Sequence, residues 1–238
     1  MSVTKEFSFM GHNATIICPD APLTGRPYIW RTEFLYAFNQ ADEALLKKGY
    51  HIIYCQYSDE YGSDRSITFF KAFRDFVTVE YSLSPKGVLF GFSRGALYAV
   101  NYALKYPRDV AGLYLDAPVL DLKSWPAGFG RGTGSPAEWE DCKKRVFGWK
   151  NDDEAKAFTG NPVDRISELI KTDIPVLLIA GDSDKTVPYE ENGRLLADAY
   201  EAADKKITVI VKENCDHHPH SLENTLPIEV FVENCFKY

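Results

Sequence analysis

The segment Gly91–Gly95 (GFSRG) constrains the fold of this chain most, because it places a serine between two glycines at the join of two expected elements. Residues 86–90, before it, form a short apolar run typical of a strand covered on both faces. After it, apolar residues recur at helical spacing from Leu97 to Leu104, until Pro107 ends the helix. A sharp strand-to-helix turn projects a hydroxyl from the backbone, so the pattern predicts a nucleophilic Ser93. An ordinary serine in a glycine-flanked loop is the alternative.

A serine hydroxyl is a weak nucleophile and requires a histidine base and a carboxylate that orients the base. Asp184 follows the apolar run 175–180 in the pattern GxxDxxVP. The loop after the next apolar run, 207–211, contains three of the five histidines, His217, His218 and His220. The chain order Ser, Asp, His, each beyond an expected strand, is the order found in α/β-hydrolases.

These positions predict Ser93 as the nucleophile, Asp184 as the acid and His217 as the base. His218 is the alternative base, because the histidine is doubled. Asp116 is the reserve acid, since it ends the expected strand 110–116 after the nucleophile helix.

The chain resembles the α/β-hydrolase superfamily over nearly its whole length. Four of its motifs are similar to those of a group of small bacterial hydrolases, some of which look like carbohydrate esterases: GFSRG at 91–95, DAPV at 116–119, KSWP at 123–126 and HHPHSL at 217–222. Residue by residue, the resemblance implies the same nucleophile, acid and base.

Strand-like and helix-like runs alternate along the chain, which predicts an α/β fold with a mostly parallel sheet covered by helices on both faces. Residues 1–238 are expected to form one domain with a cap-like insertion at about 119–165, where the pattern changes to Gly, Pro, Trp and charged residues. The expected elements include a hairpin at 6–10 and 14–18 and helices at about 32–48 and 66–83.

A developing oxyanion needs N–H donors. The backbone N–H of Arg94 is the first expected donor, because it directly follows the nucleophile. The second is expected from the loop 19–31, and Trp30 is the residue chosen there. The family's common His-Gly pair does not follow the early strand in this chain, which leaves the second donor less well defined.

Substrate contacts are predicted for Tyr61, in a loop at the carboxyl edge of the sheet, for Trp125 in the insertion, and for His218. A solvated turn for Tyr61 and core packing for Trp125 are the alternatives. With the resemblance, these residues favour a small ester on a polar molecule, such as an acetylated or methyl-esterified sugar, over a long-chain lipid.

A net charge of −7 argues against a nucleic-acid or anionic-membrane partner. No apolar stretch is long enough to span a bilayer and no leader pattern is visible, which predicts a cytoplasmic protein, although a secreted form with its signal removed would have the same sequence. The clustered histidines lack a second group of ligands, so we expect neither a metal nor another cofactor. The sequence does not indicate an oligomeric state.

These observations predict a serine hydrolase that acts on a small-molecule carboxylic ester. The alternatives are a lyase or a cofactor-free haloperoxidase-type enzyme on the same fold, or a non-catalytic binding protein.

Overall fold

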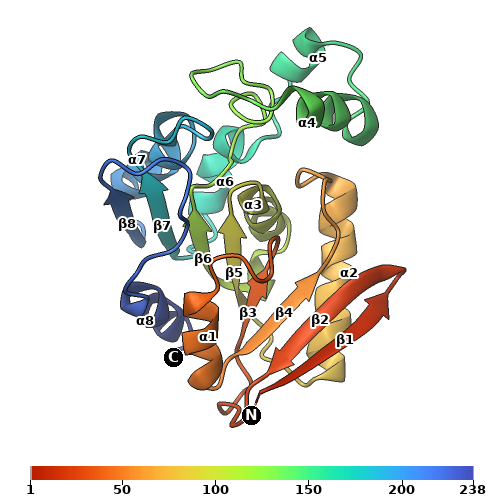
Figure 1. Cartoon of the computed structure of the whole chain (residues 1–238), viewed down its shortest axis with the longest axis vertical. Coiled ribbons are helices and arrows are strands. Elements are labelled where there is room, and N and C mark those ends of the chain that lie inside the picture. The colour runs from red at the N-terminus through yellow and green to blue at the C-terminus, as the bar shows by residue number, and fades with distance from the viewer. Residues whose placement is uncertain (1, 238) are drawn as a thin grey trace.

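The computed structural model describes residues 2–237 and has a twisted eight-stranded sheet at its centre (Figure 1). The strand order is β1-β2-β4-β3-β5-β6-β7-β8. β1 and β2 form an antiparallel hairpin, β2 is also antiparallel to β4, and all later neighbours are parallel. The strands are β1 (Val3–Phe9), β2 (His12–Cys18), β3 (Tyr28–Arg31), β4 (His51–Cys55), β5 (Gly87–Phe92), β6 (Val110–Asp116), β7 (Val176–Gly181) and β8 (Ile207–Lys212).

Helices cover both faces of this sheet, and each face has its own apolar core. The α-helices are α1 (Gln40–Lys47), α2 (Asp64–Glu80), α3 (Gly95–Lys105), α4 (Pro136–Asp141), α5 (Asp152–Lys156), α6 (Ile166–Ile170), α7 (Gly193–Ala202) and α8 (Leu226–Cys235). Buried residues of α1 and α8 pack on one face, and those of α2, α3, α6 and α7 pack on the other. The predicted α/β architecture, with a mostly parallel sheet between helices, is confirmed.

Two expected elements near the N-terminus were wrong. Residues 28–31 are expected in the loop 19–31, but they form the buried strand β3. Arg31 is completely buried there and makes two hydrogen bonds to the Asp42 carboxylate, at 2.7 and 2.9 Å. A paired guanidinium can therefore end a core strand.

The helix expected to begin near Thr32 begins only at Gln40. Phe34 and Phe38 have φ angles of 55° and 49°, in the left-handed region that an α-helix does not use. The apolar spacing that suggested a longer helix therefore belongs partly to a loop, which continues from β3 toward the carboxyl edge of the sheet.

The segment 119–165, between β6 and β7, contains α4, a π-helical turn (Cys142–Val146) and α5, and lies above the carboxyl ends of the central strands (Figure 1). Its buried side chains form a separate apolar cluster that includes Trp125 and Trp139 and also takes in Tyr61 and Leu97 from the main sheet unit. This packing fixes the segment over the strand ends. Among residues 2–237, we find no helix that is long and apolar enough to cross a membrane.

Candidate active site

Ser93 lies on a strained turn between β5 and α3. Its φ angle is 49°, which a residue with a side chain rarely adopts. A Cβ atom at Gly91 would come within 2.8 Å of the Ala96 Cα atom, so this position needs glycine. The Ser93 N–H donates to the Asp116 carbonyl at 2.9 Å, which fixes the turn against the end of β6. The local sequence thus holds one hydroxyl out of the sheet.

The histidine loop after β8 and the acid loop after β7 meet at this hydroxyl. His217 Nε2 is 3.0 Å from Ser93 Oγ, and His217 Nδ1 is 2.8 Å from Asp184 Oδ2. With an ionised Asp184, Nδ1 carries the proton and donates to the carboxylate, and Nε2 is left to accept the serine proton. The three residues predicted from their chain order therefore come within hydrogen-bonding distance of one another.

Backbone groups fix the Asp184 carboxylate. Its Oδ1 atom accepts the N–H groups of Thr186 and Val187 at 2.9 and 2.8 Å, and the side chain is almost completely buried. Because these donors belong to the main chain, the acid is oriented by the conformation of its own loop. Sequence reasoning identified this position from its motif but not these contacts.

Asp216 joins the acid loop to the histidine loop and was not singled out from the sequence. Its Oδ1 atom accepts the backbone N–H groups of His217 at 2.8 Å and Lys185 at 3.0 Å. Those two backbone hydrogen bonds, from Lys185 and His217, lower the pKa of Asp216. The carboxylate therefore helps to hold the base next to the acid.

Asp116, the reserve acid, pairs with a different histidine. Its Oδ1 atom is 2.9 Å from His220 Nδ1, and its Oδ2 atom accepts the Tyr114 hydroxyl and the Ser221 N–H at 2.7 and 2.8 Å. Asp116 is completely buried. The site thus contains a second histidine–aspartate pair beside the first.

The two expected oxyanion donors have different positions. Arg94 begins the turn into α3, where the first N–H groups of a helix lack partners within it. Trp30 is the third residue of β3, paired with Ile53 and Leu89 in the sheet, and its ring packs against Phe70 and Tyr102. The expectation that Trp30 lies on a loop facing the nucleophile was therefore wrong, because the loop begins two residues later.

Phe34, on that loop, lines the same cavity as Ser93. The preceding Thr32 fastens the loop to the serine turn, since its Oγ1 donates toward the carbonyls of Phe90 and Gly95, at 3.1 and 2.8 Å. The Phe34 N–H therefore becomes the candidate for the second donor. No charged or motif residue marks it, so only the position of β3 could have identified it.

The Arg94 side chain connects the serine turn to three carboxylates. Its guanidinium is 2.7 Å from Asp59, 3.2 Å from Glu138 and 3.7 Å from Glu33. Burial raises the pKa of Glu33, and the nearby Arg94 charge only partly offsets this effect. Because Glu138 lies on α4, one arginine links the nucleophile region to the segment 119–165.

The cavity at Ser93 has a volume of about 580 Å³. Trp125 and His218, both predicted substrate contacts, line it together with Phe34, Phe38 and Arg94. Tyr61 does not line this cavity.

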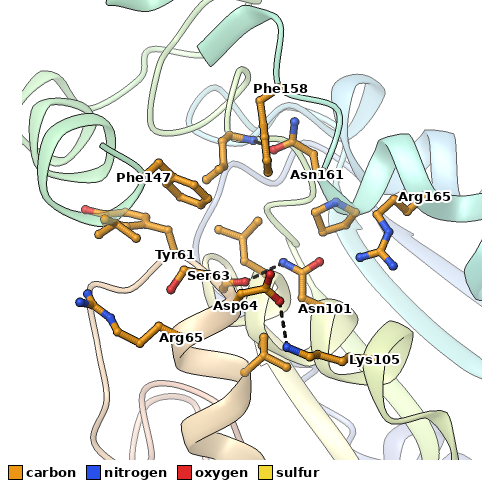
Figure 2. Close-up of a pocket in the computed structure, with 17 residues that line it drawn as sticks. Tyr61, Ser63, Asp64, Arg65, Asn101, Lys105, Phe147, Phe158, Asn161 and Arg165 are labelled. Atoms are coloured by element: carbon orange, nitrogen blue, oxygen red, sulfur yellow. Dashed lines mark hydrogen bonds and ion pairs between the residues drawn. The ribbon is translucent and has the colours of Figure 1, made fainter. Parts of the chain in front are cut away.

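Tyr61 lines a neighbouring cavity of about 670 Å³, beneath Phe147 and Phe158 of the segment 119–165 (Figure 2). Its ring is nearly buried, and its hydroxyl donates to the Glu138 carbonyl at 3.2 Å. The predicted role of Tyr61 as a substrate contact at Ser93 is therefore not supported by its location.

Comparison with known proteins gives one family match. A model of the alpha/beta hydrolase family matches residues 11–233. A search of curated protein sequences finds no match.

Solved structures with a similar fold include peptidases and a candidate lipase. A puromycin-hydrolyzing peptidase from Mycobacterium tuberculosis superposes with a TM-score of 0.72 at 13% identity, covering 98% of this chain and 38% of the peptidase. The acylaminoacyl peptidase of Pyrococcus horikoshii gives 0.64 at 15% identity, covering 91% and 38%. The candidate lipase, from Acinetobacter baumannii, gives 0.62 at 17% identity, covering 98% and 92%. This chain thus spans little more than a third of those peptidases, and at such low identity the likeness concerns the fold alone.

Proposed function

Because the chain belongs to the alpha/beta hydrolase family, we propose that it is a serine hydrolase that cleaves a carboxylic ester through an acyl-serine intermediate. The observation that carries this proposal is the continuous hydrogen-bonded chain from Ser93 Oγ through His217 to Asp184. Such a chain gives a serine hydroxyl the base that it needs at neutral pH.

In the proposed reaction, Ser93 Oγ attacks the ester carbonyl and its proton passes to His217 Nε2. The Asp184 carboxylate stabilises the resulting imidazolium through Nδ1. The imidazolium then donates the proton to the leaving alcohol oxygen as the ester C–O bond breaks. Water, deprotonated by His217, attacks the acyl-enzyme, and Ser93 recovers its proton when the acid is released.

Negative charge on the carbonyl oxygen would be stabilised by the backbone N–H groups of Arg94 and Phe34. Each such donor contributes several kcal/mol in well-studied hydrolases, roughly 3–4 kcal/mol. The rigid attachment of both backbone segments to β5 and α3, through Thr32 and the serine turn, supports this assignment.

We propose a small acyl or methyl ester on a polar molecule, such as a carbohydrate, as the substrate class. Trp125 is only 7% exposed and packs mainly in the apolar cluster of the segment 119–165, but its remaining exposed part lines the cavity, where an aromatic ring can contact a sugar face. His218 and Arg94 add polar groups beside it. A cavity of about 580 Å³ is suited to a small ligand.

The test combines active-site labelling with turnover. We expect a fluorophosphonate probe to label the wild-type chain at Ser93, and short p-nitrophenyl esters to be hydrolysed. Ser93→Ala should remove both, whereas Ser183→Ala, an exposed serine in the acid loop, should retain both. Full turnover by a well-folded Ser93→Ala protein would overturn the mechanism.

A parallel screen of acetylated and methyl-esterified glycans tests the substrate class. Labelling without ester turnover would favour lyase or haloperoxidase chemistry on the same fold. Tight ligand binding without labelling would favour a non-catalytic binding protein.

A further inference from the structure

Three histidine rings at the edge of the active-site cavity form a compact triangle. The ring centroids of His217, His218 and His220 are 4.8 to 5.0 Å apart, and the rings meet edge to face. One nitrogen from each ring can be chosen so that all three lie within 4.8 Å of one another. Nitrogens that share a tetrahedral metal with bonds of about 2.0–2.1 Å lie about 3.3 Å apart, so modest ring movements would suffice.

Two of the rings already have the support that histidine ligands of metals usually have. His217 and His220 each direct Nδ1 to a buried carboxylate, Asp184 at 2.8 Å and Asp116 at 2.9 Å. Metal-bound histidines commonly donate their second N–H to a carboxylate in this way, which fixes the tautomer and leaves the other nitrogen for the metal. Nε2 is therefore the nitrogen left for a metal on both rings, and on His217 a metal would displace the contact with Ser93 Oγ.

The third ring, His218, can complete the set. It is exposed and stacks loosely on Phe38, at a centroid distance of 5.7 Å, so it can rotate toward its neighbours. Ser93 Oγ, 3.0 Å from His217 Nε2, or a water molecule in the cavity could supply a fourth ligand.

We propose that His217, His218 and His220 form a binding site for a divalent transition metal, with Zn²⁺ as the best fit, and that the bound metal inhibits the enzyme reversibly. Imidazole nitrogens suit Zn²⁺, and the two buried carboxylates, Asp184 and Asp116, would balance its charge. This proposal departs from the sequence expectation of no metal, which rested on the lack of a second group of ligands.

Inhibition is expected because the metal and the Ser93 proton would compete for one lone pair, that of His217 Nε2. His217 Nε2 must accept the Ser93 proton during catalysis, and the same lone pair would be bound to the metal. The serine would then lose its base while Asp184 kept its contact with Nδ1. The inhibitory part of this inference rests on the proposed function, but the binding part does not.

Metal binding is measured on the full-length chain after treatment with EDTA, by competition for Zn²⁺ against a chromophoric chelator. We expect one tight site per chain. His218→Gln and His220→Gln should each weaken Zn²⁺ binding at least about tenfold, since each removes a ligand. His12→Gln removes a histidine on β2, and Cys215→Ser removes the thiol nearest in sequence to the cluster, so both should bind like the wild type.

Inhibition is measured as the Zn²⁺ concentration that halves ester turnover, relative to the metal-free rate of each variant. We expect EDTA to restore wild-type activity, and His218→Gln to require at least about tenfold more Zn²⁺. His218 is exposed, so this variant keeps the test valid even where His220→Gln fails to fold.

Each outcome decides a part of the proposal. Absence of a tight site, wild-type affinity in both histidine variants, or loss of the site in Cys215→Ser would overturn it. Binding at the histidines with unchanged turnover would overturn inhibition alone. If the chain hydrolyses no ester, the proposed function fails, but the chelator competition still tests the metal site.

Discussion

The two histidine–aspartate pairs at the carboxyl edge of the sheet have nearly identical contacts but different surroundings. In each, a buried carboxylate lies within 2.9 Å of Nδ1, and the two rings are 5.0 Å apart. His217 has Nε2 at the Ser93 hydroxyl. The His220 ring is instead packed against Phe38 and Phe92, at centroid distances of 5.3 and 5.4 Å.

The carboxylates differ as well. Asp184 is held by backbone N–H groups of its own loop, whereas Asp116 accepts the Tyr114 hydroxyl and the Ser221 N–H. Asp116 thereby joins the end of β6 to the histidine loop. Because both pairs have the same contact at Nδ1, we expect the Ser93 hydroxyl at Nε2 of His217 to be what distinguishes a catalytic pair from a structural one.

Replacing His217 or His220 with glutamine should give the largest difference in activity between the two pairs. We expect His217→Gln to lower kcat/KM for a short ester by roughly 10⁴- to 10⁶-fold, because the serine loses its base. His220→Gln should cause a much smaller loss, since His220 has no contact with the nucleophile among the described hydrogen bonds. Turnover is measured with EDTA present, and circular dichroism checks the fold. Equal losses in two well-folded variants would end the distinction between the pairs.

Substitutions of the two aspartates should have different effects, on activity for Asp184 and on stability for Asp116. We expect Asp184→Asn to lower kcat by about 10⁴-fold, since the amide no longer favours the productive histidine tautomer. Asp116→Asn should act mainly on folding, lowering the free energy of unfolding by about 1–3 kcal/mol, because buried donors lose their charged acceptor.

Urea denaturation and ester turnover, measured on both aspartate variants, test whether Asp184→Asn lowers mainly activity and Asp116→Asn mainly stability. The structural interpretation of Asp116 would be contradicted if Asp116→Asn kept wild-type stability and lost as much activity as Asp184→Asn.

The sequence predicted the parts of this site that follow from local pattern. Short apolar runs identified β5, β6, β7 and β8, and the residues just beyond three of these strands are those that meet, Ser93, Asp184 and His217. Parallel strands end at one edge, so chain order alone brings their following loops together.

Other features depend on packing between segments distant in the sequence and could not be predicted. The His220–Asp116 pair joins positions 104 residues apart, and no motif distinguishes it from the pairing of His217 with Asp116. Tyr61 faces a different cavity because the segment 119–165 packs over it. β3 was missed because Arg31 is neutralised by Asp42, a partner outside the strand.

The smallest expected effect concerns the third ring, His218, which is not paired with a carboxylate as His217 and His220 are. Partial burial, followed by the charges of His220 and His217, lowers the pKa of His218 below its usual 6.5. The unfolded chain then binds more protons than the folded chain between the lowered pKa and about 6.5. The free energy of unfolding therefore keeps its full value above pH 6.5, where the imidazole is neutral in both states, and falls as the pH drops through that window.

We expect His218→Gln to remove this pH-dependent loss of stability. The free energy of unfolding of the variant, relative to that of the wild type, should therefore rise as the pH falls from 8 to 5. The effect should be small, because His218 is exposed and solvent screens its charge. Urea denaturation of both proteins at the two pH values measures it, and the difference at pH 8, where the imidazole is neutral in both states, provides the reference. A difference that stays constant or shrinks toward pH 5 would mean that the carboxylates of the neighbouring pairs, Asp184 and Asp116, stabilise a protonated His218, and the contrast between paired and unpaired rings would fail.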